Sequence, residues 1–304
     1  MKLLTIGIPC HNEAATIGKV VADFRALYPA ARVLIIDNAS TDDTTAIARA
    51  AGAEVIHEPR KGKGNAVQRL FQAASSEYLL MVDGDDTYPA EDAALLLSLM
   101  DARGGDTVVG CRTCPDGTAF VATHQQANRL LSWFIEQVFG FRCGDLFSGY
   151  RLFHRRFYRN VPLIATGFEV EAELVLQTID KRFVQHNVDV AYRDRPEGSH
   201  SKLQTVPDGT RVLVTLLMII KDCKPLAFFS LLGGVLLLFC LLAGSVPVAD
   251  YLRFRYVFHL GLAVLAAGLG LLASLSVSCG LLLDTIVRHR KEEFFLRRRD
   301  RDDG

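Results

Sequence analysis

The chain has 304 residues, of which half are hydrophobic, and its 34 basic and 34 acidic side chains give a formal net charge of zero. A chain of this length can bury a full core and still leave material for a second region. The zero net charge argues neither for nor against a nucleic-acid partner. No basic patch interleaved with aromatic residues occurs outside the C-terminal basic tail, so we predict no nucleic-acid partner. The seven scattered cysteines are typical of reduced thiols and not of a disulfide framework.

The first 112 residues alternate short apolar runs with helical patterns. Strands are predicted at residues 3–9, 32–37, 53–58, 78–83 and 106–112, and helices at 13–27, 41–51, 63–74 and 90–102. Strands rich in Val, Ile and Leu that alternate with helices are typical of a mostly parallel sheet covered on both faces. The sequence therefore predicts an α/β fold. The opening apolar run is interpreted as the first strand and not as a signal peptide, because no small-residue cleavage site follows it.

Polar residues follow four of these predicted strands. The strand ends read PCHNE, DNASTDD, HEPRKGKGN and DGDDTYP. In open parallel sheets, ligands bind beyond the carboxyl ends of the strands. We therefore expect the four polar segments to converge on one site.

Three carboxylates crowd around one glycine in the last of these segments. Asp83, Asp85 and Asp86 would repel one another unless a cation lay among them. Asp83 and Asp85, with one residue between them, form a hard oxygen site suited to Mg²⁺ or Mn²⁺ that completes its shell with ligand phosphates. Such a metal would stabilise the charge on a departing nucleoside diphosphate. The alternative is a solvated acidic turn.

The segment RKGKGNA places Lys63 between two glycines, which let backbone N–H groups approach an anion before a helix begins. It is not a P-loop, because the terminal Lys-Ser/Thr pair is missing. Taken alone, a basic surface loop is an equally good interpretation.

Beyond residue 119 the pattern loosens. Amphipathic helices are predicted at 124–140 and 167–182, a strand at 183–193, and a polar loop after it. The segment 210–222 is apolar with charges near its ends, which predicts a helix along a membrane surface within a juxtamembrane region, 203–224.

Two uncharged runs follow, at residues 225–249 and 256–283. As a helix, each could span a hydrocarbon core of about 30 Å, so we predict a transmembrane hairpin; two buried core helices are the alternative. Basic residues before the hairpin and in the tail, 284–304, outnumber those in the connecting loop. This asymmetry predicts an integral membrane protein, of a cell inner membrane, with the catalytic domain and both termini in the cytoplasm.

Seven motifs occur in a characteristic order: IPCHNE, IDNASTDDT, RKGKGNA, DGDDTYP, SGYRLF, GFEVEAELV and RPEGSHSKL. This set closely resembles the family 2 glycosyltransferases of the polyprenyl-phosphate sugar synthase type, such as the dolichyl-phosphate mannose synthases. The resemblance implies a GT-A nucleotide-sugar-binding domain, which we assign to residues 1–202. The motifs specify the family and not the sugar.

The resemblance also implies roles for individual residues. Those expected to bind the nucleotide sugar are Pro9, Asn12, Glu13, Asp37, Lys63 and Asp83, and those expected to bind the metal are Asp83 and Asp85. Positions that match those lining the donor and acceptor phosphates are Arg129, Ser148, Arg151, Arg195 and Lys202. The remaining acidic candidates are Glu169, Glu171 and Glu173, of which at least one is expected to be a solvated helix charge. Arg129 as a solvated helix charge and Ser148 as part of a simple turn are the alternatives.

The leading interpretation is a metal-dependent, inverting hexosyltransferase that moves one sugar from a UDP- or GDP-sugar to polyprenyl phosphate at the cytoplasmic face of a membrane. Inversion is implied by the resemblance. One alternative keeps the fold but transfers sugar to a lipid or glycan hydroxyl. Another is a catalytically inactive, membrane-anchored protein that binds nucleotide sugars. Membrane lipids are expected partners, and a homo-oligomer is left open.

Overall fold

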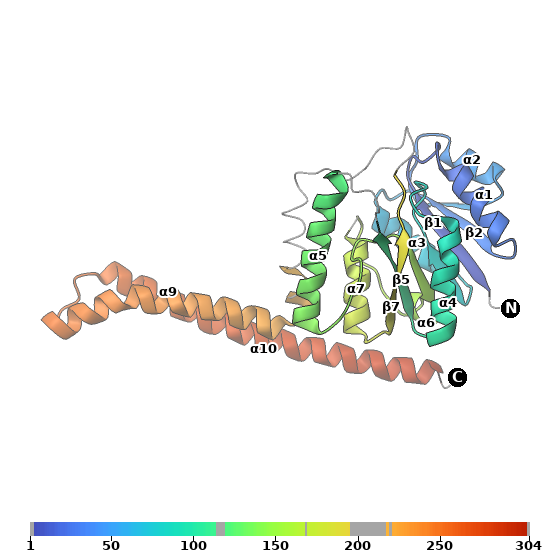
Figure 1. Ribbon diagram of the computed structural model, residues 1–304. Coiled ribbons are helices and arrows are strands. Elements are labelled where there is room, and N and C mark those ends of the chain that lie inside the picture. The colour runs from blue at the N-terminus through green and yellow to red at the C-terminus, as the bar shows by residue number, and fades with distance from the viewer. Residues whose placement is uncertain (1–2, 114–118, 168, 195–216, 219–220, 303–304) are drawn as a thin grey trace. The chain divides into compact units, whose positions relative to one another are not determined.

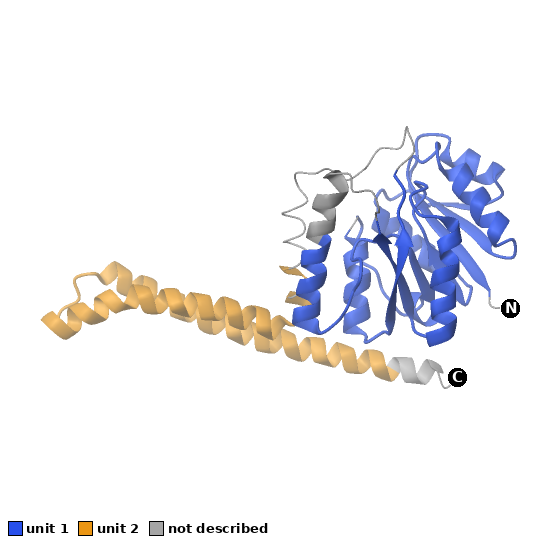
Figure 2. Cartoon of the chain, in the orientation of Figure 1, with its two compact units in different colours: residues 1–212 blue, residues 213–304 orange. Residues whose placement is uncertain are grey.

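The computed structural model describes residues 3–113, 119–167, 169–194, 217–218 and 221–302, with the backbone alone at 119–127 and 297–302. The chain divides into two units, residues 1–212 and 213–304, which Figure 2 colours separately. Arg195 and Lys202 lie outside the described residues, as does most of the predicted juxtamembrane helix.

The first unit is built on a seven-stranded sheet with the order β3-β2-β1-β4-β6-β5-β7 (Figure 1). Its first four strands pair in parallel, β5 pairs in parallel with β7, and β6 runs antiparallel to both β4 and β5. The predicted α/β class with a mostly parallel sheet is confirmed. The strands are β1 (Leu4–Cys10), β2 (Arg32–Asp37), β3 (Glu54–His57), β4 (Tyr78–Met81), β5 (Thr107–Thr113), β6 (Arg151–His154) and β7 (Gln185–Ala191).

Helices cover both faces of this sheet. On one face, α1 buries Ile17, Val20, Val21 and Phe24, which recur at the three- and four-residue spacing of one helix side. On the other face, Gly7 of β1 lies directly against Leu70 of α3, leaving no room for a side chain. The helices are α1 (Ile17–Leu27), α2 (Thr44–Ala50), α3 (Lys63–Ala73), α4 (Ala93–Arg103), α5 (Ala119–Phe139), α6 (Arg155–Tyr158) and α7 (Val170–Asp180), with a 3₁₀ turn, η1 (Ala90–Asp92).

The sequence did not predict β6, which is only four residues long. Its direction matters for the site. Because β6 is antiparallel to β4, Arg151 at its start pairs with Met81 at the end of β4. Arg151 also pairs with Val109 of β5. The segment that precedes β6 therefore lies at the carboxyl end of β4, beside Asp83.

The second unit contains two long apolar helices, α9 (Pro225–Phe254) and α10 (Leu260–Asp302). By length and composition, Pro225–Phe254 and Leu260–Leu296 could each cross a membrane. They fit the predicted transmembrane hairpin. The connection differs from the predicted one: α9 continues to Phe254, and Arg255, with φ 56°, ends it in the left-handed conformation.

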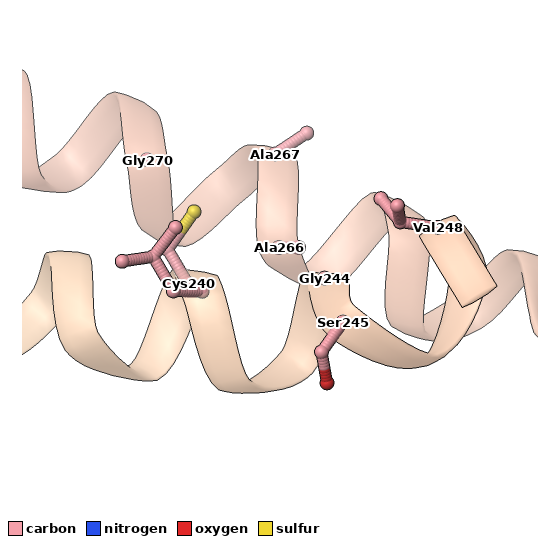
Figure 3. Close-up of a pocket in the computed structure, with 8 residues that line it drawn as sticks. Cys240, Gly244, Ser245, Val248, Ala266, Ala267 and Gly270 are labelled. Atoms are coloured by element: carbon pink, nitrogen blue, oxygen red, sulfur yellow. The ribbon is translucent and has the colours of Figure 1, made fainter.

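Small residues allow α9 and α10 to approach closely. A β-carbon at Gly244 would lie 3.5 Å from Ala266 Cβ, and one at Gly270 would lie 3.4 Å from Cys240 Sγ. Figure 3 shows these positions around a groove between the two helices. The hydroxyl of Ser245, beside the groove, donates to the Leu242 carbonyl of its own helix at 2.7 Å. Close packing through glycine and alanine is typical of helix pairs in lipid. The groove has no charged side chain, so we do not place chemistry there.

Candidate active site

The four polar segments predicted to converge do so, because β3, β2, β1 and β4 are neighbours and run in parallel. Asn12, with φ 52°, links the first two segments. Its backbone N–H donates to Ser40 Oγ at 3.0 Å, and its side-chain oxygen accepts from the Thr41 N–H at 2.8 Å. The adjacent Pro9 is half-buried at the end of β1, and the Glu13 N–H donates to Thr44 Oγ1 at 2.8 Å.

Asp37 ends β2 and is 4% exposed. One carboxylate oxygen lies 2.8 Å from His57 Nδ1, and the other accepts from the Ser40 N–H at 3.2 Å. Burial opposes ionisation of this carboxyl, but hydrogen bonds from Ser40 and His57 outweigh it and lower the pKa of Asp37. Asp37 is thus a fixed anion at the strand edge.

Asn38 was not predicted as a site residue, yet it positions the loop before α3. Its side-chain N–H₂ group donates to the Arg60 carbonyl, and its side-chain oxygen accepts from the Gly62 N–H, both at 2.7 Å. Asn38 is 4% exposed. An asparagine after a strand signals only a turn in the sequence, so its long-range partners could not be read from the motif.

The same loop is held by Glu58, which is buried. Arg60 donates from its backbone N–H and its guanidinium to this carboxylate at 2.8 to 3.0 Å. The Arg60 guanidinium lowers the pKa of Glu58 to about 2.

Lys63 lies at the centre of the site. Its ammonium nitrogen is 2.7 Å from Asp83 Oδ1 and 2.7 Å from Glu171 Oε1. Burial opposes the charge, but Asp83 and Glu171 together raise the pKa of Lys63, so the side chain is cationic at neutral pH. The three crowded carboxylates were expected to need a cation among them, and the structure places the Lys63 ammonium beside Asp83.

Glycines on both sides of Lys63 let α3 begin against another segment of backbone. Gly62 has φ 131°, and a β-carbon there would lie 3.1 Å from the Thr166 carbonyl carbon. A β-carbon on Gly64 would lie 2.6 Å from the Ala165 carbonyl carbon. Both positions require glycine, and the start of α3 is clamped against the chain that leads into α7.

Gly149 brings the loop before β6 against Asp83. A β-carbon on Gly149 would lie 2.6 Å from Asp83 Cγ and 2.7 Å from Asp83 Oδ1. The Gly149 N–H donates to Tyr88 Oη at 3.2 Å, which fixes the loop from beneath. Burial raises the pKa of Tyr88, so this phenol stays neutral. Ser148 and Arg151 of this motif were predicted from the sequence as site residues, whereas the close approach of Gly149 to Asp83 was not predicted.

Ser148 and Arg151 are both buried and bonded to the protein itself. Ser148 Oγ donates to the Gly110 carbonyl at 2.6 Å. The Arg151 guanidinium donates to the carbonyls of Ser148 at 2.9 Å and Leu146 at 2.8 Å, and Arg151 is 1% exposed. This geometry favours a role in shaping the loop over the expected contact with phosphate.

Asp85 is buried, with 5% of its surface exposed. Its Oδ1 accepts from the Thr87 hydroxyl at 2.7 Å. The next residue, Asp86, has φ 59°, an uncommon conformation for a residue with a side chain. Lys19 holds it through an ion pair of 2.9 Å. The acidic segment is thus a strained turn tied to α1.

Arg129 is exposed on α5, next to a residue that anchors this helix. Asn128 donates to Asp145 Oδ1 at 2.9 Å and accepts from the Leu146 N–H at 3.0 Å. Asp145 also binds the Arg112 guanidinium, at 2.6 and 2.9 Å. Arg129 is therefore an available cation on a helix fixed to the loop before β6.

The acidic candidates before and in α7 differ in burial and in their partners, and Glu173 accepts from the N–H groups of Ile164 and Ala165 at 2.9 to 3.0 Å. Glu171 is 3% exposed and bound to Lys63. Glu169 is exposed, and its carboxylate accepts from the N–H groups of Thr166 and Gly167 at 3.2 and 2.9 Å. Glu169 thus stabilises the turn that precedes α7, while Glu171 belongs to the site.

Comparison with known proteins identifies the family. Residues 5–161 match the Glycosyl transferase family 2. The glycosyltransferase AglJ of Haloferax volcanii is 32% identical over 251 residues, which cover 82% of this chain and 80% of that protein. The dolichyl-phosphate hexose transferase of the same organism is 26% identical over 210 residues, covering 69% and 90%.

The fold has solved counterparts. Glucosyl-3-phosphoglycerate synthase from Mycobacterium tuberculosis, in complex with Mn²⁺ and uridine-diphosphate-glucose, aligns with a TM-score of 0.59 and 22% identity. The alignment covers 73% of this chain and 79% of that one, and it supports the GT-A-like fold of the first unit. With the match over residues 5–161 and the 32% identity to AglJ, these findings confirm the predicted resemblance: the chain belongs to glycosyltransferase family 2.

Proposed function

We propose that this protein transfers one sugar from a nucleoside-diphosphate sugar to polyprenyl phosphate, at the cytoplasmic face of a membrane, with inversion at the anomeric carbon. The observation that carries the proposal is the joint presence of an acidic and cationic site at the strand ends and two apolar helices in the same chain. The name of the dolichyl-phosphate hexose transferase supports a lipid-phosphate acceptor. The UDP-glucose bound by the M. tuberculosis synthase supports a nucleotide-sugar donor.

The donor would lie along the edge formed by β3, β2, β1 and β4. Asp37 and the segment that begins with Pro9, Asn12 and Glu13 would contact the base and ribose, as expected for the family. Lys63 forms an ion pair of 2.7 Å with Asp83 and would approach the diphosphate. A buried cation beside the diphosphate offsets its charge more strongly than one in water.

A divalent ion fits this site. Asp83 already holds a cationic group, the Lys63 ammonium, at 2.7 Å. No cluster of three His, Cys, Asp or Glu side chains that could hold a metal occurs in the part of the chain that the structure describes. An ion bound here would therefore take only a few protein ligands, Asp83 and Asp85, and complete its shell with water and phosphate oxygens, as Mg²⁺ and Mn²⁺ do. When bound, it would stabilise the charge that develops on the departing nucleoside diphosphate.

Phosphate and hydroxyl acceptors differ in whether the attacking oxygen must lose a proton. A phosphate monoester has a second pKa of about 6, so at neutral pH it carries an anionic oxygen that needs no general base. That oxygen would form the bond to the anomeric carbon, and the bond from this carbon to the donor phosphate would break, which releases the nucleoside diphosphate. Cations must bring the two anions together, and Arg129 is exposed and suited to bidentate phosphate binding. Arg195 and Lys202 are further candidates for binding the acceptor phosphate, because their side chains are cationic.

A hydroxyl acceptor would need a positioned base. Glu169 is the exposed acidic candidate, but it caps the Thr166 and Gly167 N–H groups. Glu171 is bound to Lys63. Neither geometry favours a free general base, which supports the phosphate acceptor over the hydroxyl one. An inactive binding protein is disfavoured because Asp83, Asp85 and Lys63 are all in place.

The acceptor can be tested with purified full-length protein in detergent, given either polyprenyl phosphate or the corresponding polyprenol. We expect product only from the phosphate. Arg129→Ala should lower this transfer by about ten- to hundredfold, the value of about 1.5–3 kcal/mol for hydrogen bonds to a charged group. Glu169→Gln should have a much smaller effect. Arg142→Ala is the matched control, because Arg142 is an exposed arginine that pairs with Glu136. Loss of turnover in Glu169→Gln with polyprenol as the better acceptor would contradict the proposal.

The proposed topology follows from the charges around the hairpin. The catalytic domain, residues 1–202, and the tail, 284–304, would both lie in the cytoplasm. The span predicted at 225–249 corresponds to α9, which continues to Phe254, and the span predicted at 256–283 corresponds to α10, which begins only at Leu260. Basic residues favour the cytoplasmic side. The long hydrocarbon tail of the acceptor would then stay in the bilayer while its phosphate reaches the site.

A further inference from the structure

Lys63 is shared between two carboxylates that come from distant parts of the chain. Asp83 follows β4, whereas Glu171 lies in the first turn of α7. The side chains of Lys63, Asp83 and Glu171 are 15%, 26% and 4% exposed, so Asp83 is the member of the trio most open to solvent. Glu171 Oε2 is buried and has no hydrogen-bond partner among the described residues. A buried carboxylate oxygen without a hydrogen bond lowers the free energy of unfolding, unless a ligand or a moving side chain binds it in another state of the protein.

Lys63 competes with a metal ion for Asp83 in the present geometry. The ammonium nitrogen is 2.7 Å from Asp83 Oδ1. A bound Mg²⁺ or Mn²⁺ would need to come within about 2.1 Å of a carboxylate oxygen. The other oxygen, Oδ2, faces Gly149, where even a β-carbon would collide with the carboxylate. A cation that arrives alone would therefore meet an occupied ligand and a like charge.

Lys63 would keep a carboxylate partner if its ammonium moved away from Asp83. Its backbone is fixed by Gly62 and Gly64, which pack against the carbonyls of Thr166 and Ala165. The ammonium can still leave Asp83 without becoming unpaired, because Glu171 Oε1 is also 2.7 Å away and Oε2 is available. Glu171 thus offers a place for the displaced ammonium inside the site.

We propose that Lys63 is a resident cation that screens Asp83 from a divalent metal until a nucleoside diphosphate binds, and that Glu171 is the positioning residue that retains the ammonium when Asp83 is released. This inference rests on the donor site of the proposed function. The diphosphate supplies the negative charge that allows Lys63 and the metal to lie in one site. Metal and diphosphate consequently bind cooperatively, each tightening the other by the same factor.

The test is Mn²⁺ binding to the full-length protein in detergent, measured by electron paramagnetic resonance with and without UDP or GDP, in the absence of an acceptor. The wild-type protein should bind Mn²⁺ weakly alone and more tightly with one of the nucleotides. Lys63→Met should bind Mn²⁺ alone about tenfold more tightly or better, since a unit charge next to the metal site is removed. The factor by which the nucleotide tightens Mn²⁺ binding should be smaller in Lys63→Met than in the wild type.

The role of Glu171 is tested in two backgrounds. Glu171→Gln should weaken Mn²⁺ binding when Lys63 is present, because the ammonium then loses its contact with the Glu171 carboxylate and is held more strongly at Asp83. The same substitution should have little effect in Lys63→Met, since Glu171 acts through Lys63. Lys63→Met alone leaves the buried Glu171 carboxylate without its cationic partner and could destabilise the fold. The double variant, Lys63→Met with Glu171→Gln, avoids this because it removes one charge of each sign. It too should bind Mn²⁺ alone more tightly than the wild type.

Lys61→Met is the matched control, because Lys61 is an exposed lysine of the same loop. It should change Mn²⁺ affinity by less than about threefold, as expected for a screened surface charge. If Lys61→Met and Lys63→Met raised the affinity for Mn²⁺ equally, the loss of one positive charge would explain the effect without any contact to Asp83, and the proposal would be overturned. Mn²⁺ affinity in both Lys63 variants no higher than in the wild type would also overturn it. None of these measurements uses an acceptor, so they fail or succeed independently of lipid-linked product formation.

Discussion

Gly149→Ala tests whether the loop before β6 sets the position of Asp83. The added methyl group would lie 2.6 Å from Asp83 Cγ, and the carboxylate is held on its other side by Lys63 at 2.7 Å. A normal contact between two carbon atoms is about 3.5 Å or longer. Asp83 or the loop must therefore move by about 1 Å. A misplacement of this size in a catalytic group costs about 10²-fold in rate.

The assay is steady-state sugar transfer by the purified variant, together with its thermal unfolding. We expect kcat/KM to fall by about 10²-fold while the protein remains folded. Gly234→Ala is the control, because Gly234 is a helix residue with open space around its missing side chain. It should keep wild-type transfer. Wild-type kcat/KM in Gly149→Ala would refute the view that close packing at this glycine positions Asp83.

Three further predictions concern the metal, the pH dependence and the topology. Asp85→Ala should reduce turnover by about 10³-fold, and chelation of divalent ions should do the same; full activity in EDTA would contradict a metal role. The pKa of Glu58 is lowered from 4.5 to about 2, so its stabilising effect is complete above about pH 4.5 and is lost as the pH falls through about 2. Between these pH values the melting temperature of the wild type should therefore fall more steeply than that of Glu58→Gln, and parallel curves would contradict this. A single cysteine at Arg301 should resist a membrane-impermeant reagent in intact cells, whereas labelling from outside would reverse the proposed orientation.

Much of the parallel half of the sheet could be predicted from local patterns. The strand predicted at residues 32–37 coincides with β2, because an apolar run buried on both faces leaves a continuous signal. The convergence of Asp37, Lys63 and Asp83 also followed, since parallel neighbouring strands present their carboxyl ends at one edge. These predictions needed only the order of the strands and the chemistry of the residues that follow them.

The antiparallel part of the fold could not be predicted in the same way. β6 has four residues, too few to show a period, and its position between β4 and β5 depends on pairing with strands far away in the sequence. The burial of Arg151 follows from that pairing, so the motif alone suggested a phosphate ligand. The contact between Lys63 and Glu171 is similar, because it joins the starts of two helices separated by more than half of the first unit.

The most direct test of the account is mass spectrometry of the lipid after detergent-purified protein is incubated with polyprenyl phosphate and a panel of UDP- and GDP-sugars. We expect one of these donors to yield polyprenyl phosphate heavier by a single sugar residue, together with an equal amount of the free nucleoside diphosphate. A panel in which no donor modifies the lipid phosphate, while a lipid or glycan hydroxyl gains the sugar, would contradict it.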